Sequence, residues 1–230
     1  AASCAHPTRA GPVHLSSHRR GAHVEDDLAH RDFSVLAMAL AATSERLLDP
    51  EAPEWARCRP LAVSLSPAPV ALVHEVSPYV AASTGHGRIA RLEASAAHDG
   101  ALLSLRLVWP DPTRDDRIAD LDRFADAAAV MFPLAPGANP FSMGAPDKPV
   151  NAWLWRADAT EPYDVIAEGY ATTRRRPAGT SGLRAAARHT NGAWSIVFQR
   201  PLAAEQAGCV RFQPGALEKP AAQGKRVPNA

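Results

Sequence analysis

The segment VNAWLWRAD, residues 150–158, decides the predicted fold because two kinds of side chain alternate along it. Asn151, Trp153 and Trp155 occupy every second position, and aliphatic residues stand between them. Successive side chains of a β-strand point to opposite faces of the sheet. The segment therefore predicts a strand that carries its largest residues on one face.

Other short alternating segments lie on both sides of this strand, and prolines and glycines separate them. Two separators, Asp-Gly at 99–100 and Asn-Gly at 191–192, are typical of β-hairpin turns. The further predicted strands lie in LAVSL (61–65), PVALVHEV (69–76), GRIARLEASAAHDG (87–100), ALLSLRLVW (101–109), YDVIAEGYATTRRR (163–176) and AWSIVFQR (193–200). Many short strands with long connections predict a mainly β fold, an antiparallel β-sandwich with short helices and long irregular loops.

Two apolar segments fit two interpretations each. AAAVMF at 127–132 ends a charge-rich connection and fits either a strand or the end of a short helix. SVLAMALAAT at 34–43 fits either a short amphipathic helix or the remnant of a secretory signal, and acidic residues precede it.

The two ends of the chain differ from its body in composition. The first thirty residues hold five of the nine histidines without any metal-ligand spacing, which favours a disordered or non-native tail over a metal site. We expect such a tail, with the signal-like remnant, over 1–44. One β-sandwich domain should follow over 45–218, and an irregular C-terminal tail over 219–230.

Charge and cysteine content exclude several classes of protein. The formal net charge of +1 provides no bulk field for binding nucleic acid or an anionic membrane. No segment approaches the roughly 20 apolar residues that span a bilayer. The three cysteines form no CxxC motif, which argues against zinc ribbons, iron–sulfur clusters and covalently attached haem. Cys58 and Cys209 could form one disulfide or remain free thiols.

No sequence motif of a common enzyme class is present. GxSxG, HExxH, Walker and GxGxxG motifs are all missing, and we assign no catalytic residue. The acidic residues in DPTRDDRIADLD (111–122) alternate with arginines, which favours a salt-bridged surface loop over a calcium site. The arginines at 174–176 favour a solvated loop over an anion or partner contact.

Met143 stands in a proline- and glycine-rich loop, PLAPGANPFSMGAPDKP (133–149), where regular structure is not expected. Prolines restrict the backbone around it. An apolar side chain at this place is either core packing or a sulfur ligand held on a stiff loop. A thioether is a soft, neutral ligand that suits haem iron.

The region around Met143 resembles the haem-binding γ subunits of ethylbenzene dehydrogenase, dimethyl sulfide dehydrogenase and related molybdenum enzymes of the type II dimethyl sulfoxide reductase group. The likeness extends from about residue 47 to about residue 212. The residues that carry it are Trp109, Asp111, Phe132, Pro133, Pro140, Phe141, Met143, Gly144, Pro149, Val150, Asn151, Trp153, Trp155, Ala157 and Asp158.

This resemblance implies a β-sandwich that binds one non-covalent haem b through a methionine and a lysine. Met143 occupies the Met-Gly position of the family, and Met131 is the alternative sulfur ligand. Phe141, Trp153 and Trp155 are expected to wall the porphyrin, although they could equally form the sandwich core.

The lysine ligand is where this sequence departs from the family. The tryptophan-bearing strand that precedes the family's lysine is missing, and VRFQPGALEK runs directly into PAAQGKRVPNA. Lys225 matches the family's context best, and Lys219 is the alternative. A lysine must be buried to lose its proton and bind iron.

By this resemblance the chain is a periplasmic electron-transfer subunit and not itself catalytic. It would exchange electrons with a molybdenum-cofactor catalytic subunit through an iron–sulfur subunit, and with a soluble carrier such as a cytochrome c. The alternative is a haem-free β-sandwich that binds a carbohydrate or another small ligand, with Trp153 and Trp155 as a stacking platform. A third reading is a vestigial relative that folds poorly.

Overall fold

The computed structural model describes residues 37–39, 44–67, 87–118, 124–139, 141–203 and 205–212, and for 37–39 the backbone alone. Most of these residues lie in strands or in the loops that join them. The elements are β1 (Ala37–Ala39), α2 (Ser44–Leu48), η1 (Pro53–Arg57), β2 (Leu61–Ser64), β3 (Arg91–His98), β4 (Leu102–Pro110), β5 (Ala127–Pro133), β6 (Val150–Arg156), β7 (Tyr163–Ala167), β8 (Arg174–Arg175), β9 (Arg184–Thr190) and β10 (Ala193–Pro201).

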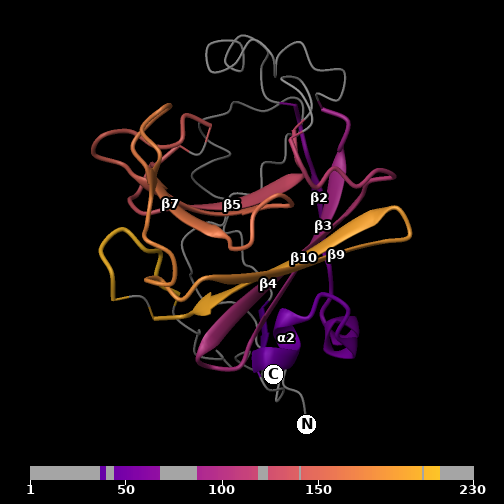
Figure 1. Cartoon of the computed structure of the whole chain (residues 1–230). Coiled ribbons are helices and arrows are strands. Elements are labelled where there is room, and N and C mark those ends of the chain that lie inside the picture. Colours follow the sequence, from indigo (N-terminus) through magenta and orange to yellow (C-terminus); the bar gives the residue numbers. More distant parts are fainter. Residues whose placement is uncertain are drawn as a thin grey trace, which may run out of the picture.

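The strands form two sheets that lie as separate layers (Figure 1). Sheet 1 has the order β1-β3-β4-β10-β9, and β2 also pairs with β3. Sheet 2 has the order β5-β6-β7-β8. All pairs are antiparallel except β1 with β3. The predicted mainly β sandwich is confirmed.

The main core lies between the sheets and is rich in aromatic residues. Trp153 of β6 and Phe198 of β10 are both 0% exposed. Their rings tilt toward each other with centroids 6.3 Å apart. On sheet 1, Trp194 stands opposite Trp109 in the β10–β4 register, and the two rings stack. The face of β6 that the sequence predicted to be bulky is therefore the face that sheet 1 covers.

A second, smaller core lies on the other side of sheet 1, under α2 and η1. It contains Leu47, Trp55, Cys58 and Val197, all buried. Cys58 is thus on the outer side of sheet 1, whereas Cys209 belongs to the segment after β10. Cys58 and Cys209 are not joined to each other, so the disulfide considered from the sequence does not form in this structure.

Several local expectations can now be compared with the structure. The segment 127–132 is strand β5 and not a helix end. The described part of 34–43 is strand β1, which pairs with β3, so the helix interpretation is wrong there. The segment 163–176 forms two strands, β7 and β8, with a loop between them. The predicted strand at 69–76 lies outside the described residues.

The Asn-Gly turn at 191–192 joins β9 to β10 as predicted. Asn191 and Gly192 have φ values of 53° and 70°, the left-handed conformation that a type I′ hairpin turn needs at both central residues. This hairpin supplies β10, which lies between β4 and the edge strand β9 in sheet 1.

Candidate haem-binding site

The candidate site is built on the loop 134–149, which leaves β5 and returns to β6. A hydrogen bond of 3.0 Å from Leu134 N to Pro149 O closes the loop at its base. Within it, Gly144 N donates to Asn139 O at 2.8 Å, and Phe141 N donates to Asn139 Oδ1 at 2.9 Å. These bonds curl the chain around Asn139 and place residue 143 at a turn.

Met143 lies in that turn with φ = 55°, a left-handed conformation that non-glycine residues rarely adopt. Gly144 follows with φ = 89°. A Cβ at Gly144 would approach Lys148 O to 2.7 Å and Ala167 O to 3.0 Å, so only glycine fits this place. The Met-Gly pair of the sequence therefore has a structural cause, since the glycine lets the turn pack against β7.

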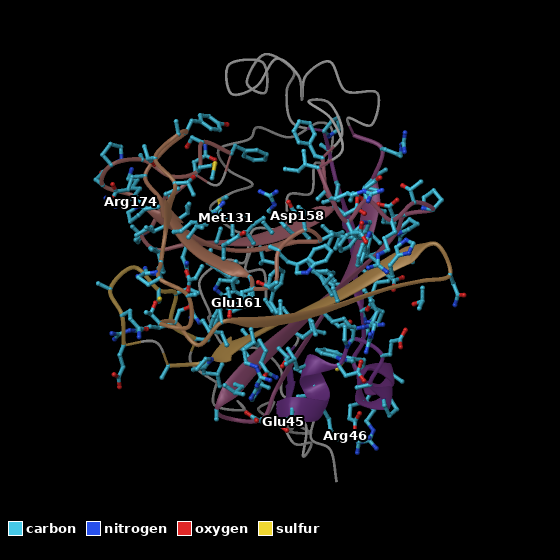
Figure 2. All side chains as sticks on the ribbon, in the orientation of Figure 1. Glu45, Arg46, Met131, Asp158, Glu161 and Arg174 are labelled. Atoms are coloured by element: carbon cyan, nitrogen blue, oxygen red, sulfur yellow. The ribbon has the colours of Figure 1, made fainter. Side chains whose placement is uncertain are left out.

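The side chain of Met143 packs at the outer side of sheet 2, away from sheet 1. It lies against a small cluster of Ala138, Val150 and Ala167, and Met131 packs against the same cluster. Met131 lies on the side of β5 remote from sheet 1 (Figure 2). The structure thus brings together the two methionines that sequence reasoning treated as alternatives.

Around the methionines the outer side of sheet 2 carries a grid of residues without formal charge, here called the outer apolar face. Three strands contribute three residues each, in register. They are Ala129, Leu154 and Tyr163 in one row, Met131, Ala152 and Val165 in the next, and Pro133, Val150 and Ala167 in the third. Standard strand spacings make this grid about 10 Å by 14 Å.

The donor and the surface fit a non-covalent haem in part. None of the nine residues of the outer apolar face is charged. Four of them are buried, namely Val150, Ala152, Val165 and Ala167, and the other five are exposed or half-buried. Met143 is half-buried at its border and provides a neutral soft donor. Met143 therefore suits one axial ligand, and the five exposed or half-buried positions are open to an apolar contact, whereas the other four are already buried.

The aromatic residues predicted to wall the porphyrin lie in two different places. Phe141, two residues before Met143, is 46% exposed. Trp153 and Trp155 are 0% and 8% exposed and belong to the core between the sheets. Neither tryptophan presents the open ring face that the carbohydrate-binding alternative requires.

The lysines predicted to supply the second axial ligand lie outside the described residues. Lys225 and Lys219 both lie beyond residue 212, outside the described residues. Each stays a prediction. Among the residues that are described, no group of three or more His, Cys, Asp and Glu side chains could hold a metal ion.

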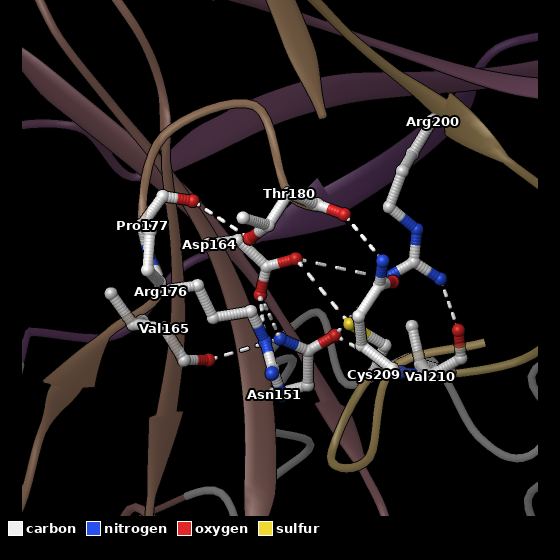
Figure 3. A network of polar contacts seen from close by, with 10 residues as sticks. Asn151, Asp164, Val165, Arg176, Pro177, Thr180, Arg200, Cys209 and Val210 are labelled. Carbon is white, nitrogen blue, oxygen red and sulfur yellow. Dashed lines mark hydrogen bonds and ion pairs between the residues drawn. The ribbon is translucent and has the colours of Figure 1, made fainter. Parts of the chain in front are cut away.

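A buried polar network that the sequence did not reveal lies on the inner side of sheet 2 (Figure 3). Asp164 of β7 accepts a hydrogen bond of 2.6 Å from Asn151 of β6. Arg176 Nε lies 3.4 Å from one oxygen of Asp164, and Arg200 Nη1 lies 3.9 Å from the other. Arg200 is 0% exposed, and burial lowers the pKa of its guanidinium.

The network also fixes the segment 205–212, which follows β10. Arg200 Nη2 donates to Val210 O, and Val210 N donates to Asn151 Oδ1 at 3.1 Å. Burial raises the pKa of the Cys209 thiol, which lies 3.8 Å from Asp164. The segment ends at Phe212, whose ring packs on Trp153.

The arginine run at 174–176 is only partly the solvated loop that was predicted. Arg174 pairs with Glu168 at 3.2 Å, and the Arg175 guanidinium lies 3.9 Å from the ring centroid of Tyr163. Arg176 instead turns inward to Asp164, with its side chain 16% exposed. Strand alternation explains only why Arg175 and Arg176 face opposite sides, because neighbouring residues of a strand point to opposite faces.

The charge-rich loop before β5 is anchored by a carboxylate that sequence reasoning missed. Asp126 Oδ2 accepts hydrogen bonds of 2.8 Å from Trp194 Nε1 and from Asp115 N. Burial is the main cause of the raised pKa of Asp126. In the described part of the loop, Arg114 pairs with Asp116 at 3.2 Å on the surface, as predicted.

The helices of the described residues are short. None of them is long and apolar enough to cross a membrane.

Comparison with known proteins shows that the chain is similar to subunits of two reductases and a dehydrogenase. It is 39% identical over 114 residues to the chlorate reductase subunit gamma of Ideonella dechloratans, covering 49% of this chain and 46% of that protein. It is 37% identical over 115 residues to a putative respiratory nitrate reductase heme subunit of Haloferax mediterranei, covering 50% and 41%. It is 35% identical over 114 residues to the dimethylsulfide dehydrogenase subunit gamma of Rhodovulum sulfidophilum, covering 47% and 43%.

The aligned segments span less than half of the length of each of these relatives. The family model described as ethylbenzene dehydrogenase matches residues 52–186, which is more than half of the 230 residues and includes β2 to β8 with the Met143 loop. On that match, the chain belongs to the ethylbenzene dehydrogenase family.

Proposed function

We propose that this protein is an electron-transfer subunit that binds one non-covalent haem b at the outer apolar face, with Met143 as an axial ligand to the iron. The observation that carries the proposal is the left-handed turn at Met143, which holds a half-buried thioether at the border of that face. One of the similar proteins is itself described as a heme subunit.

The residues of the site would bind and tune the cofactor without chemistry of their own. A bound haem supplies a one-electron couple between ferrous and ferric iron. The neutral, soft sulfur of Met143 favours the ferrous state and so raises the reduction potential. The apolar residues of sheet 2 exclude water from the side they cover, which acts in the same direction.

The second axial ligand and the partners are further parts of this proposal. Lys225 would supply the other axial ligand, as the resemblance implies, with Lys219 as the alternative. Electrons would pass between a molybdenum-cofactor catalytic subunit with its iron–sulfur subunit and a soluble carrier such as a cytochrome c, in the periplasm. Two of the similar proteins are themselves gamma subunits, one of a reductase and one of a dehydrogenase, which supports an assembly of this kind.

An absorption spectrum of the haem-supplied protein tests the proposal directly. We expect the Soret and α bands of a reduced low-spin b-type haem. Met143→Ala should change these bands and lower the reduction potential. Met131→Leu is the matched control, because leucine preserves the packing on Ala138 and Val150 but removes the sulfur.

Two outcomes would contradict the proposal. A folded protein that stays colourless when supplied with haem would show that the protein does not bind this cofactor. A spectrum that changes with Met131→Leu and not with Met143→Ala would identify Met131, and not Met143, as the axial ligand.

A further inference from the structure

The backbone around Met143 is held from outside its own loop, by the loop that joins β7 to β8. The N–H of Gly169 donates a hydrogen bond of 3.0 Å to the carbonyl oxygen of Met143. The hydroxyl of Tyr170 donates to the carbonyl oxygen of Phe141. Two consecutive residues of one loop thus bind two alternate carbonyl groups of the other.

The loop that makes these bonds is itself braced by Thr172. Thr172 Oγ1 donates to Gly169 O at 2.7 Å and accepts from Glu168 N at 2.8 Å. Glu168 in turn pairs with Arg174 of β8 at 3.2 Å. The residues 169–172, here called the 169–172 clamp, are therefore tied back to the end of sheet 2.

A clamp is needed because Met143 has a backbone conformation that it would not keep by itself. Residues with a Cβ rarely stay at φ = 55° unless surrounding contacts fix them there. If the turn relaxed to a right-handed conformation, the Cα–Cβ bond would swing away from Val150 and Ala167. The thioether would then leave the border of the outer apolar face.

We propose that Tyr170 is a positioning residue for the Met143 thioether, and that it acts with Gly169 and Thr172 as one clamp. The inference rests on the proposed function, in which Met143 binds haem iron. Tyr170 is 39% exposed, and it touches Met143's loop through the backbone of Phe141 and not through the sulfur. Its effect on the iron would be indirect.

The first test uses the protein without haem and the ¹³C-methyl signals of its methionines, assigned by Met→Leu substitutions. In Tyr170→Phe and Thr172→Val, the Met143 methyl signal should shift and sharpen, because the side chain moves more freely. The Met131 signal should stay in place. Thr180→Val is the matched control, since Thr180 Oγ1 makes the same kind of bond, 2.7 Å to Pro177 O, in another loop.

The second test measures how fast an external ligand replaces Met143 on the iron of the haem-loaded protein. Imidazole is added to the ferric form, and release of the sulfur is followed by loss of the sulfur-to-iron charge-transfer absorption, which displacement of a lysine would leave in place. Loss of one hydrogen bond from the clamp should speed the replacement about 2- to 12-fold in Tyr170→Phe and Thr172→Val. The rate in Thr180→Val should equal that of the unchanged protein.

The outcomes separate this inference from the proposed function. If no haem binds but the Met143 methyl responds to Tyr170→Phe, the haem proposal fails and the clamp stands. If haem binds through Met143 and neither the methyl signal nor the replacement rate changes in either clamp variant, the clamp is overturned. Thr172→Val keeps the test decisive if Tyr170→Phe does not fold.

Discussion

Replacing Arg200 by methionine tests the buried polar network most directly. The side chain is 0% exposed, donates to Val210 O and lies 3.4 Å from Asn151 Oδ1. Its guanidinium carbon is also 4.9 Å from the centre of the Trp153 ring. A hydrogen bond from a charged group contributes about 1.5–3 kcal/mol, and a desolvated cation–π contact about 2 kcal/mol.

Methionine returns part of this through apolar packing, so we expect Arg200→Met to lower the free energy of unfolding by about 3–5 kcal/mol, the usual result of removing one partner of a buried ion pair. The assay is urea unfolding followed by tryptophan fluorescence. Hydrogen exchange at the Val210 amide, which donates to Asn151, should accelerate as well. Arg184→Met, on the exposed side of β9, is the matched control and should change stability by less than about 0.5 kcal/mol. A loss below about 1 kcal/mol for Arg200→Met, with Val210 still protected, would show that the network does not hold the 205–212 segment.

Three further substitutions probe other parts of the fold. Gly144→Ala should destabilise the protein by about 1–3 kcal/mol in denaturant unfolding, because its Cβ would meet Lys148 O at 2.7 Å at a left-handed φ; an unchanged midpoint would refute the tight turn. Because burial raises the pKa of Asp126 in the folded protein, the protonated carboxyl stabilises the fold. This stabilisation is fully present at pH values below the unfolded pKa and is lost as the pH rises through the folded pKa. Asp126→Asn keeps an oxygen for Trp194, so it should stabilise the protein at neutral pH, and the gain should vanish near pH 3 in thermal melts; equal gains at both pH values would contradict this. Trp153→Ala should cost about 3–5 kcal/mol by opening a cavity in a core where the ring is 0% exposed, and a loss under 2 kcal/mol would argue against that packing.

Alternation along β6 and the Asn191-Gly192 turn predicted most of the architecture, because strand period and hairpin geometry are local properties of the chain. The segment 127–132 stayed ambiguous for the same reason. Its alternation is weak, and pairing with β6, which the local sequence does not encode, makes it a strand.

The site was predictable only as far as its own loop. The Met-Gly motif and its prolines single out Met143 as a candidate ligand, which stays a prediction, but they do not indicate the contacts that hold its backbone. Tyr170 reaches Phe141 across 29 residues, and Arg200 reaches Asn151 across 49. Such contacts depend on how β7 and β10 are placed in the sheets. No spacing rule marks Tyr170 or Arg200, and Arg200 in particular has the polar character of a residue at the exposed end of a strand.

The backbone at residue 143 also limits which donor atoms could replace the sulfur. Histidine and asparagine tolerate a positive φ better than branched aliphatic residues, whose Cβ substituents crowd the chain there. Imidazole is therefore the substitute nitrogen donor that strains this turn least. A Met143→His protein should therefore keep the present loop. If it binds the porphyrin, its midpoint potential would show the effect of exchanging the ligand atom alone.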